Sequence, residues 1–509
     1  MRYLARLCRA LALAGGFALV AGFGSLPETS ATPQAAVAAA PIDVGEEVAA
    51  FYRDRGFQPL WIAGGSLRPE ARRLLSIAGG SDAERAELAA GVEAAASGED
   101  RALARADLLL SRAFVRTVVD LHRPPTRSSM RYIDAGLAPT EWPTRALLEE
   151  AAAAPSLGDH LDAALRVNPA FDGLNRGLAA WRARWSRLPQ LRVDGAPGQR
   201  AQKLRRRLGL AAAAPDAELA ATLRQFQSAH GLPANGRADA ATLAALNAGA
   251  GHYERLILAN IERARAIPAR AGRYILVDTA SARLWMVEDG HIAGSMRVIV
   301  GKPEMPTPVM AGLIRYAVFN PYWNLPPDLI RKRARNVLRR GTRAIAAEQL
   351  QILSDWTPRA RTLTPGQVDW RAVASGRRFV NLRQRPGPGN MMGRVKFMMP
   401  NDLGVYLHDT PLRHFFAHAD RRISSGCVRL EDAPRLARWL FEGRPPQPSG
   451  AAEQRVDLPE AVPVYIAYFT ALPSRGGIVF QPDRYGRDRT SLARQHGPGL
   501  DRANPIGPG

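Results

Sequence analysis

A cysteine and a histidine near the carboxyl end of the chain have types and spacing suited to nucleophilic catalysis. Cys427 lies in the stretch RRISSGCVRL, and His408 precedes it by 19 positions (427 − 408) in the stretch GVYLHDTP. A thiol attacks well only as the thiolate, and an imidazole within hydrogen-bond reach can accept its proton and later protonate a leaving amine. A cysteine with nearby histidines therefore allows nucleophilic catalysis, and His414 and His418 also precede Cys427.

The residues around the cysteine suit the binding of a reaction intermediate. Ser424, Ser425 and Gly426 are small, so backbone N–H groups there can approach a substrate and hold the oxyanion of a tetrahedral intermediate. Arg429 carries a charge that can bind a substrate carboxylate or steady the loop.

The first residues of the chain indicate in which compartment the Cys427 thiol is found and whether a second cysteine is present. Residues 1–31 combine arginines with a short apolar, Ala/Gly-rich run, as is typical of a secretory signal peptide, and Cys8 lies within them. We expect export, with an uncleaved membrane anchor as the alternative. Cleavage would leave Cys427 as a lone cysteine, either buried and inert or free and reactive, and composition does not choose between the two.

Composition narrows the class of partner. The 509 residues suffice for two to four domains, and the formal net charge is +22. Nearly all basic residues are arginines, and they are spread along the chain without a basic stripe interleaved with aromatics. Nucleic acid is therefore not expected as a partner, whereas an anionic surface or wall polymer is compatible with the charge.

Hydrophobic periodicity predicts helical parts in the first half of the chain. After a linker at 32–44, apolar residues spaced i, i+3, i+4 predict a helical scaffold domain over 45–190. Three short helices are expected over 191–250, where HGLPANG supplies turn glycines.

The period changes to two after residue 272, which predicts a mainly-β, β-sandwich-like domain over 272–488. Asp289-Gly290 indicates a hairpin turn. A helical insertion at about 325–380 is interpreted as a lid, in which tryptophans line a substrate face or anchor the core. The Gly/Pro-rich residues 489–509 predict a disordered tail. The tryptophans that would line the substrate face of the insertion or anchor its core are Trp323, Trp356 and Trp370.

Two parts of the chain resemble known cell-wall modules. The pattern Phe226-Gln227, His230-Gly231-Leu232, Asn235-Gly236 within 191–250 resembles a peptidoglycan-binding module of the three-helix type. The motif HDTP followed by RRISSGCVRL resembles the active site of L,D-transpeptidases with a YkuD-type catalytic domain. The order of parts is similar to a large subgroup with a helical scaffold, a wall-binding module and a helical lid.

The resemblance implies roles for individual residues. Cys427 matches the acyl-forming nucleophile and His408 the general base, with Ser425, Gly426 and Arg429 as oxyanion or supporting residues. Many members carry His at Ser425 and Gly at Asp409, so this chain departs from the pattern at both positions. The candidates for substrate binding are Tyr406, Asp409, Trp323, Asn324 and Ser424.

The implied reaction joins the third residues of two peptidoglycan stem peptides in a 3-3 crosslink. The cysteine forms a thioester with a donor tetrapeptide stem, D-alanine leaves, and an amine of the acceptor stem resolves the thioester. The resemblance implies no metal or organic cofactor, a periplasmic location and sensitivity to carbapenems. Other cell-wall synthesis enzymes are further candidate partners.

Several alternatives stay open on sequence alone. His414 and His418, spaced i, i+4 near Asp409, allow a zinc D,D-peptidase, although this would leave Cys427 unexplained. A non-catalytic peptidoglycan-binding scaffold protein would account for residues 191–250. The same cysteine chemistry with water as acceptor gives a carboxypeptidase, and with a lipoprotein lysine it gives an anchoring enzyme.

Overall fold

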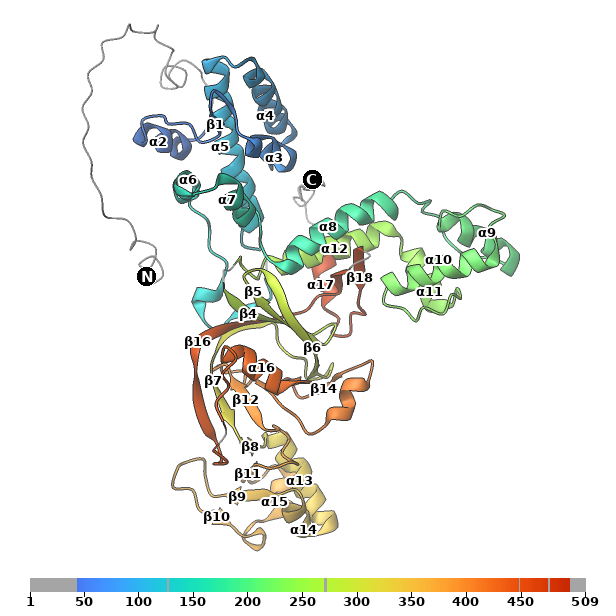
Figure 1. Cartoon of the computed structure of the whole chain (residues 1–509). Helices are drawn as coiled ribbons and strands as arrows, with labels where there is room; N and C mark the ends of the chain where they lie inside the picture. Colours follow the sequence, from blue (N-terminus) through green and yellow to red (C-terminus); the bar gives the residue numbers. More distant parts are fainter. Residues whose placement is uncertain (1–43, 126–127, 270–271, 448, 475–476, 495–509) are drawn as a thin grey trace, which may run out of the picture.

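The computed structural model describes residues 44–125, 128–269, 272–447, 449–474 and 477–494. The expected signal peptide, and all but residue 44 of the expected linker, lie outside these ranges. Figure 1 shows three groups of elements that project from a central sheet-rich domain. Within the described ranges, every helix is too short or too polar to cross a membrane.

The first group is a bundle of helices around the long helix α5, drawn in blue to teal in Figure 1. Its core contains Trp61 and Phe114, which meet edge to face and are fully buried. The buried Asp107 carboxylate accepts the Trp61 N–H at 2.6 Å, so the loop after α2 is tied to α5. The elements are α2 (Glu46–Asp54), β1 (Ile62–Ala63), β2 (Ser66–Leu67), α3 (Pro69–Ile77), α4 (Asp82–Ala94), η1 (Ala95–Ser97), α5 (Asp100–His122), α6 (Thr144–Ala153) and α7 (Leu157–Ala164). The short helix η2 (Ala135–Leu137) packs instead against the central domain.

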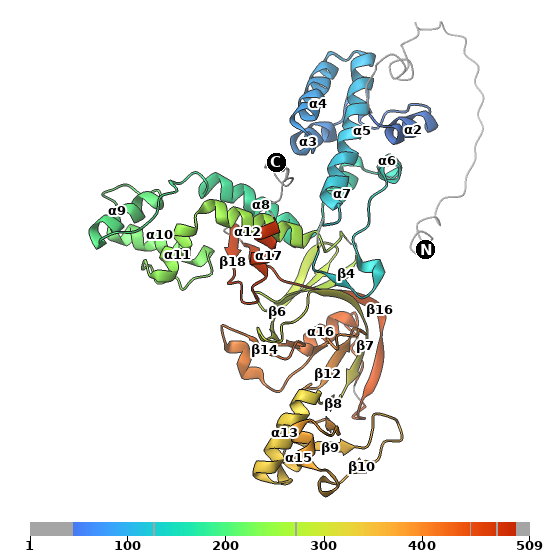
Figure 2. The same ribbon diagram turned by 180° about the vertical axis from the view of Figure 1, so that it is seen from behind.

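The second group contains the three helices predicted within 191–250. Figure 2 shows them at the far end of two long helices, α8 and α12, which run side by side. The Gln227 amide group is buried and bonds Asn235, Thr242 and the Gly236 N–H, so the turn residues of the motif act mainly in folding. The elements are α8 (Pro169–Arg184), α9 (Pro197–Arg207), α10 (Asp216–Ala229), α11 (Ala240–Ala248) and α12 (Ala250–Ala264).

The expected sheet-rich domain is confirmed, and its main sheet closes on itself. The strand order is β12-β13-β15-β6-β5-β4-β16-β7, and β12 also pairs with β7, so the domain is a closed ring in place of two stacked sheets. The predicted hairpin turn is confirmed, with positive φ at Asp289 and Gly290. The strands are β4 (Arg273–Asp278), β5 (Arg283–Glu288), β6 (His291–Gly301), β7 (Met310–Phe319), β12 (Val395–Met398), β13 (Leu407–His408), β15 (Val428–Leu430) and β16 (Gln454–Ala467), with β14 (Arg422–Ser424) beside β6 and β3 (Arg131–Tyr132) beside β7.

Two cores hold this domain in place. Side chains on the inner face of the ring pack with helix α16 (Ala433–Leu440). Alternate residues of β4 and β16, such as Tyr274 and Tyr465, point the other way and pack under the group that contains α8 and α12. This second core includes the hairpin β17 (Ala471–Ser474) and β18 (Gly477–Phe480). The inner face of the ring is therefore filled, and its outer face is covered at β4 and β16.

The insertion differs from the expected helical lid because it carries its own sheet and its own core. Its strand order is β10-β9-β11-β8, and helices α13 and α15 pack against one another. The sequence did not reveal this sheet, since two of its strands have only two residues. The elements are β8 (Trp323–Asn324), α13 (Pro327–Arg340), α14 (Arg343–Ala347), β9 (Leu350–Leu353), β10 (Thr362–Leu363), η3 (Pro365–Gln367), α15 (Trp370–Ser375) and β11 (Asn381–Gln384).

The expected disordered tail does not begin at residue 489. Helix α17 spans Arg487–Arg494. Its Asp488 carboxylate pairs with Arg263 of α12 at 2.8 Å and accepts the Thr470 hydroxyl. These buried partners favour a helix where the polar, glycine-containing sequence suggested a tail. The rest of the expected tail lies outside the described residues.

Candidate functional site

Strands β13 and β15 bring the predicted cysteine and histidine to the same face of the sheet. The strands are parallel, with Leu407 opposite Val428 and His408 opposite Arg429. Leu407 and Val428 are fully buried in the inner core. Since side chains alternate across a strand, His408, Arg429 and the adjoining Cys427 lie on the outer face.

A tight turn before β15 presents the cysteine. Gly426 has a φ of 116°, in a region that L side chains rarely adopt, so glycine is required by the backbone. The buried Ser424 hydroxyl donates to the Cys427 carbonyl oxygen at 2.7 Å and accepts the Gly426 N–H at 3.2 Å. Ser424 therefore holds the turn, whereas Ser425 is exposed.

The thiol of Cys427 is half-buried and free of any disulfide. Its Sγ donates to the Gly404 carbonyl oxygen at 3.5 Å. Burial raises the pKa of the thiol, while the Tyr406 N–H, the Arg429 charge and the Tyr406 hydroxyl act in the opposite direction. At neutral pH the resting group is therefore a thiol, and the surrounding groups favour the thiolate once its proton is removed.

His408 is buried and uncharged. Burial, followed by the nearby Arg429 charge, lowers the pKa of the imidazole to about 3. Its Nδ1 lies 2.5 Å from the Asp409 carbonyl oxygen, an acceptor that calls for a proton on Nδ1, and the Met392 backbone also bonds the ring. In this conformation the thiol is bonded to Gly404, and the contact between a nucleophile and its base is often long until substrate binds.

Tyr406 and Asp409 have different parts in this arrangement. The Tyr406 ring lies 5.7 Å from the His408 ring, and its hydroxyl bonds the cysteine, so it stands at the centre of the site. The Asp409 carboxylate is buried, accepts the Arg394 N–H at 2.9 Å and pairs with Arg413. It is therefore occupied in holding the loop over His408, which leaves it poorly placed to bind substrate.

The two remaining substrate-binding candidates lie on another sheet. Trp323 and Asn324 form β8 of the insertion and pair with β11. Trp323 packs against the core of the insertion and Trp370 is buried in it, while Trp356 is 50% exposed. Of the three tryptophans, only Trp356 has a largely free face.

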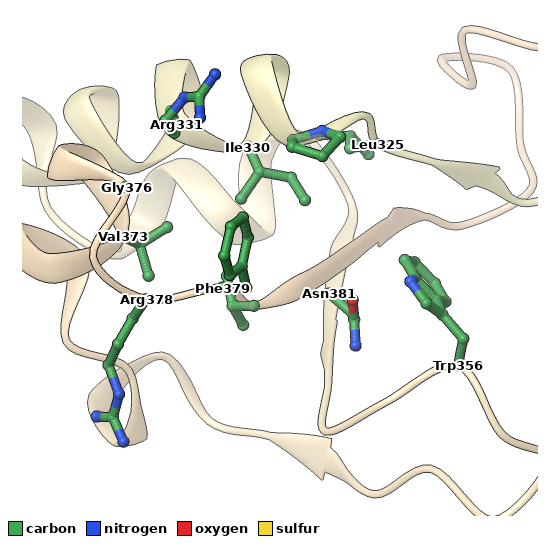
Figure 3. Close-up of a pocket in the computed structure, with 11 residues that line it drawn as sticks. Leu325, Ile330, Arg331, Trp356, Val373, Gly376, Arg378, Phe379 and Asn381 are labelled. Atoms are coloured by element: carbon green, nitrogen blue, oxygen red, sulfur yellow. The ribbon is translucent and has the colours of Figure 1, made fainter.

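Trp356 borders a hollow on the insertion, shown in Figure 3. Phe379, which is 81% exposed, lies beside Ile330, and Asn381 lies on the side of it toward Trp356. Arg331 and Arg378 line the same hollow. It combines apolar surface with positive charge, and none of its lining residues belongs to the cysteine motif.

The histidines considered for zinc do not form a metal site. The rings of His414 and His418 are 6.4 Å apart, and Asp409 is engaged by Arg413. The described ranges contain no group of three or more His, Cys, Asp or Glu side chains that could hold an ion. This donor set does not fit the four-coordinate site that zinc requires.

Sequence reasoning missed Thr307 and Tyr485. Thr307 is fully buried, and its hydroxyl donates to the Gly426 carbonyl oxygen at 2.8 Å. The Tyr485 hydroxyl donates to the carbonyl oxygen of Gly301, the residue whose N–H bonds Thr307. Tyr485 lies in none of the stretches discussed above, and Thr307 lies in the proline-rich stretch GKPEMPTP (301–308), whose resemblance to the same subgroup assigns it no role.

Comparison with protein-family profiles finds three matched segments. Residues 272–462 match the profile of the L,D-transpeptidase catalytic domain, residues 46–178 that of a scaffold domain, and residues 206–246 that of a domain described as "Putative peptidoglycan binding domain". The matched catalytic segment contains His408 and Cys427.

The chain is also similar to individual proteins. It is 33% identical over 242 residues to a Haemophilus influenzae protein named "Putative L,D-transpeptidase". The aligned residues make up 45% of this chain and 47% of that protein. The chain thus spans about half the length of this relative. Similar solved structures include an L,D-transpeptidase from Mycobacterium smegmatis, which is 15% identical over 38% of this chain and 58% of that one, with a TM-score of 0.19. A mutant L,D-transpeptidase of Enterococcus faecium is 14% identical over 40% of this chain and 52% of that one, with a TM-score of 0.19.

Proposed function

Since residues 272–462 match the profile of the L,D-transpeptidase catalytic domain, we propose that this chain forms 3-3 crosslinks between peptidoglycan stem peptides through a thioester on Cys427. The observation that carries the proposal is the register of β13 and β15, which puts His408 and Cys427 on one face. A neutral imidazole on the same face of the sheet as the thiol supports base-assisted attack.

The first half-reaction transfers the donor peptide to the enzyme. The Cys427 Sγ attacks the carbonyl carbon of the third residue of a tetrapeptide stem, and His408 accepts the thiol proton. Backbone N–H groups of the cysteine turn bind the oxyanion. The intermediate then breaks its bond to the terminal D-alanine, whose amine takes the proton from His408, and the thioester remains.

The second half-reaction releases the crosslinked product. The side-chain amine at the third residue of an acceptor stem attacks the thioester carbon and gives up a proton to His408. The carbon–sulfur bond breaks, and the departing thiolate recovers its proton from the imidazole. Arg429, whose charge favours the thiolate, assists the departure of the sulfur.

Two other segments of the chain support a function at the cell wall, outside the cytoplasm. The segment matching a peptidoglycan-binding domain would hold the enzyme on its polymer substrate. Residues 1–31 would direct the chain to the periplasm. Stem peptides, as donor and acceptor, would be the principal partners.

Purified enzyme and isolated tetrapeptide stems test the proposal directly. We expect mass spectrometry to detect a dimer that has lost one D-alanine and whose fragments place the new bond between two third residues. A monomer shortened by one residue, without dimer, would mean that water is the acceptor and would contradict the crosslinking function.

We propose that the insertion binds substrate as a lid. Residues 325–380 contain twelve Lys or Arg and four Asp or Glu, so much of the net charge of the chain lies in this part. Stem peptides carry carboxylates, which such a charge attracts. The exposed Trp356 and Phe379 add apolar surface beside Arg331 and Arg378.

Removal of residues 330–378, with a short Gly/Ser linker in their place, tests the lid. The Leu325 N–H donates to the Leu382 carbonyl oxygen at 2.9 Å, so the two ends lie side by side, and the insertion has its own core. We expect an unchanged melting temperature and a KM for stem peptides raised about tenfold, the loss of about 1.4 kcal/mol of binding. Trp356→Ala with Phe379→Ala, which spares the fold, should raise KM in the same direction. Global unfolding of the shortened chain would instead make the insertion part of the core.

A further inference from the structure

A buried threonine outside the cysteine motif holds the backbone just before the nucleophile. The Thr307 hydroxyl donates to the Gly426 carbonyl oxygen at 2.8 Å and accepts the Gly301 N–H at 2.8 Å. Thr307 lies 119 residues before Gly426, so only the fold brings them together. Because the hydroxyl has both a donor and an acceptor partner, its rotation is set and the Gly426 carbonyl group has a defined direction.

The Gly426 carbonyl and the Cys427 N–H belong to one peptide unit. A peptide unit is planar and trans, so its C=O and N–H point in opposite directions. Since Thr307 holds the C=O from the protein interior, the Cys427 N–H is turned away from Thr307. In the part of the chain that the structure describes, no partner is found for this N–H, whereas the neighbouring Gly426 N–H is used by Ser424.

We propose that Thr307 is a positioning residue, which orients the Gly426–Cys427 peptide so that the Cys427 N–H donates to the oxyanion. Preorganised donors of this kind stabilise the charge that develops on the carbonyl oxygen during acyl transfer. The inference rests on the proposed function, because an oxyanion forms only if Cys427 attacks a carbonyl carbon.

The C-terminal segment, which lies beyond the matched catalytic domain, hydrogen-bonds the backbone of Thr307 and of Gly301. Arg487 donates to the Thr307 carbonyl oxygen at 3.1 Å, and the Tyr485 hydroxyl donates to the Gly301 carbonyl oxygen. The Tyr485 ring stacks on Tyr468, with centroids 5.2 Å apart. The start of α17 is therefore connected to the cysteine turn through Thr307.

Two reactions of the same thiol separate this role from simple support of the fold. Acylation by a carbapenem passes through a tetrahedral oxyanion, whereas alkylation by iodoacetamide displaces iodide at a saturated carbon and needs no oxyanion donor. The two rate constants would be measured on the full chain by mass spectrometry of the Cys427 adduct. Thr307→Val removes the hydroxyl with little change of volume, and Thr307→Ser restores it.

We expect Thr307→Val to slow acylation about 10- to 100-fold, somewhat less than the loss of a complete oxyanion donor. Alkylation should stay within about twofold, because it depends on the thiolate alone. Thr307→Ser should acylate at nearly the wild-type rate. Thr279 is a matched control, since it is also fully buried and donates to a backbone carbonyl, that of Ala467, at 2.9 Å. Thr279→Val should leave the ratio of the two rates unchanged.

Other outcomes would overturn the inference. Equal loss of acylation and alkylation in Thr307→Val would mean that Thr307 only stabilises the loop, and an unchanged acylation rate would mean that the bond to Gly426 has no part in the reaction. Should Thr307→Val not fold, Tyr485→Phe removes the more distant support and is expected to slow acylation alone, by a smaller factor. A wild-type chain that is alkylated but never acylated would count against the proposed function itself.

Discussion

Cys427→Ala is expected to abolish both peptide crosslinking and covalent labelling by a carbapenem. The Sγ atom is the group that forms the thioester. The serines of the same turn are not expected to replace it, since the Ser424 hydroxyl is bonded to the Cys427 carbonyl group and the Ser425 side chain is exposed. The Cys427 side chain is only half-buried, and its hydrogen bond to the Gly404 carbonyl oxygen is long, so its loss should lower the melting temperature little. Dimer formation and the mass of the labelled peptide are the measurements.

Two further variants sharpen this test. Cys427→Ser keeps the shape of the side chain but has a hydroxyl that is much harder to ionise, so it should be inactive as well. His414→Gln changes a nearby histidine to which no role is assigned and should retain full activity. Crosslinking by Cys427→Ala at the wild-type rate would exclude the thioester, and inactivity of His414→Gln would reopen a part for that histidine.

His408→Asn should have the second largest effect, a fall in kcat/KM of about 10²- to 10⁴-fold, the usual contribution of a general base. The asparagine amide can still donate to the Asp409 carbonyl oxygen, as Nδ1 does, but has no basic nitrogen. Packing is thereby largely kept while the proton acceptor is removed. Wild-type activity in a folded His408→Asn chain would contradict the assigned role.

The pH dependence follows from the buried imidazole. Burial and the Arg429 charge lower the pKa of His408 to about 3, so the wild-type imidazole remains neutral well into the acid range. We expect no loss of kcat/KM from this group near pH 6.5, the ordinary value for histidine. Since burial raises the pKa of the Cys427 thiol, the rate of alkylation by iodoacetamide should rise only above the ordinary cysteine value near 8.5. An acid limb centred near pH 6.5 that disappears in His408→Asn would show that the imidazole is not neutralised by burial.

The free energy of unfolding should also depend on pH through His408. Because the folded pKa of His408 lies below the unfolded one, the unfolded chain binds the extra proton as the pH falls. This contribution to the free energy of unfolding is complete above about pH 6.5 and is lost progressively toward pH 3. His408→Asn should flatten the dependence of the melting temperature on pH within that window.

Local features of the fold were predictable from the sequence because they depend on residues close together in the chain. The Asp289-Gly290 turn needs two residues that accept positive φ, and the three helices within 191–250 follow from apolar spacing and turn glycines. The cysteine turn is local as well, since Gly426 supplies its backbone conformation and Ser424 its hydrogen bonds.

Local patterns misled where short elements or isolated side chains were concerned. The two-residue strand β8 has no period to detect, so the sheet of the insertion was not foreseen. The polar sequence after residue 488 suggested a disordered tail. The start of α17 is nevertheless held by buried partners of Asp488, namely Arg263 on α12 and Thr470 just before β17. Asp409, a substrate-binding candidate by position, is instead occupied by Arg394 and Arg413.

The sequence by itself determined the chemistry available to this protein: a thiol, an imidazole and a turn of small residues that exposes backbone N–H groups. Only the tertiary structure decided how these groups meet. Pairing of β13 with β15 puts His408 and Cys427 on one face, and Thr307 reaches the turn from 119 residues away. Such contacts depend on strand register and on closure of the sheet, which arise from packing of the whole inner core and leave no mark in a short stretch of sequence.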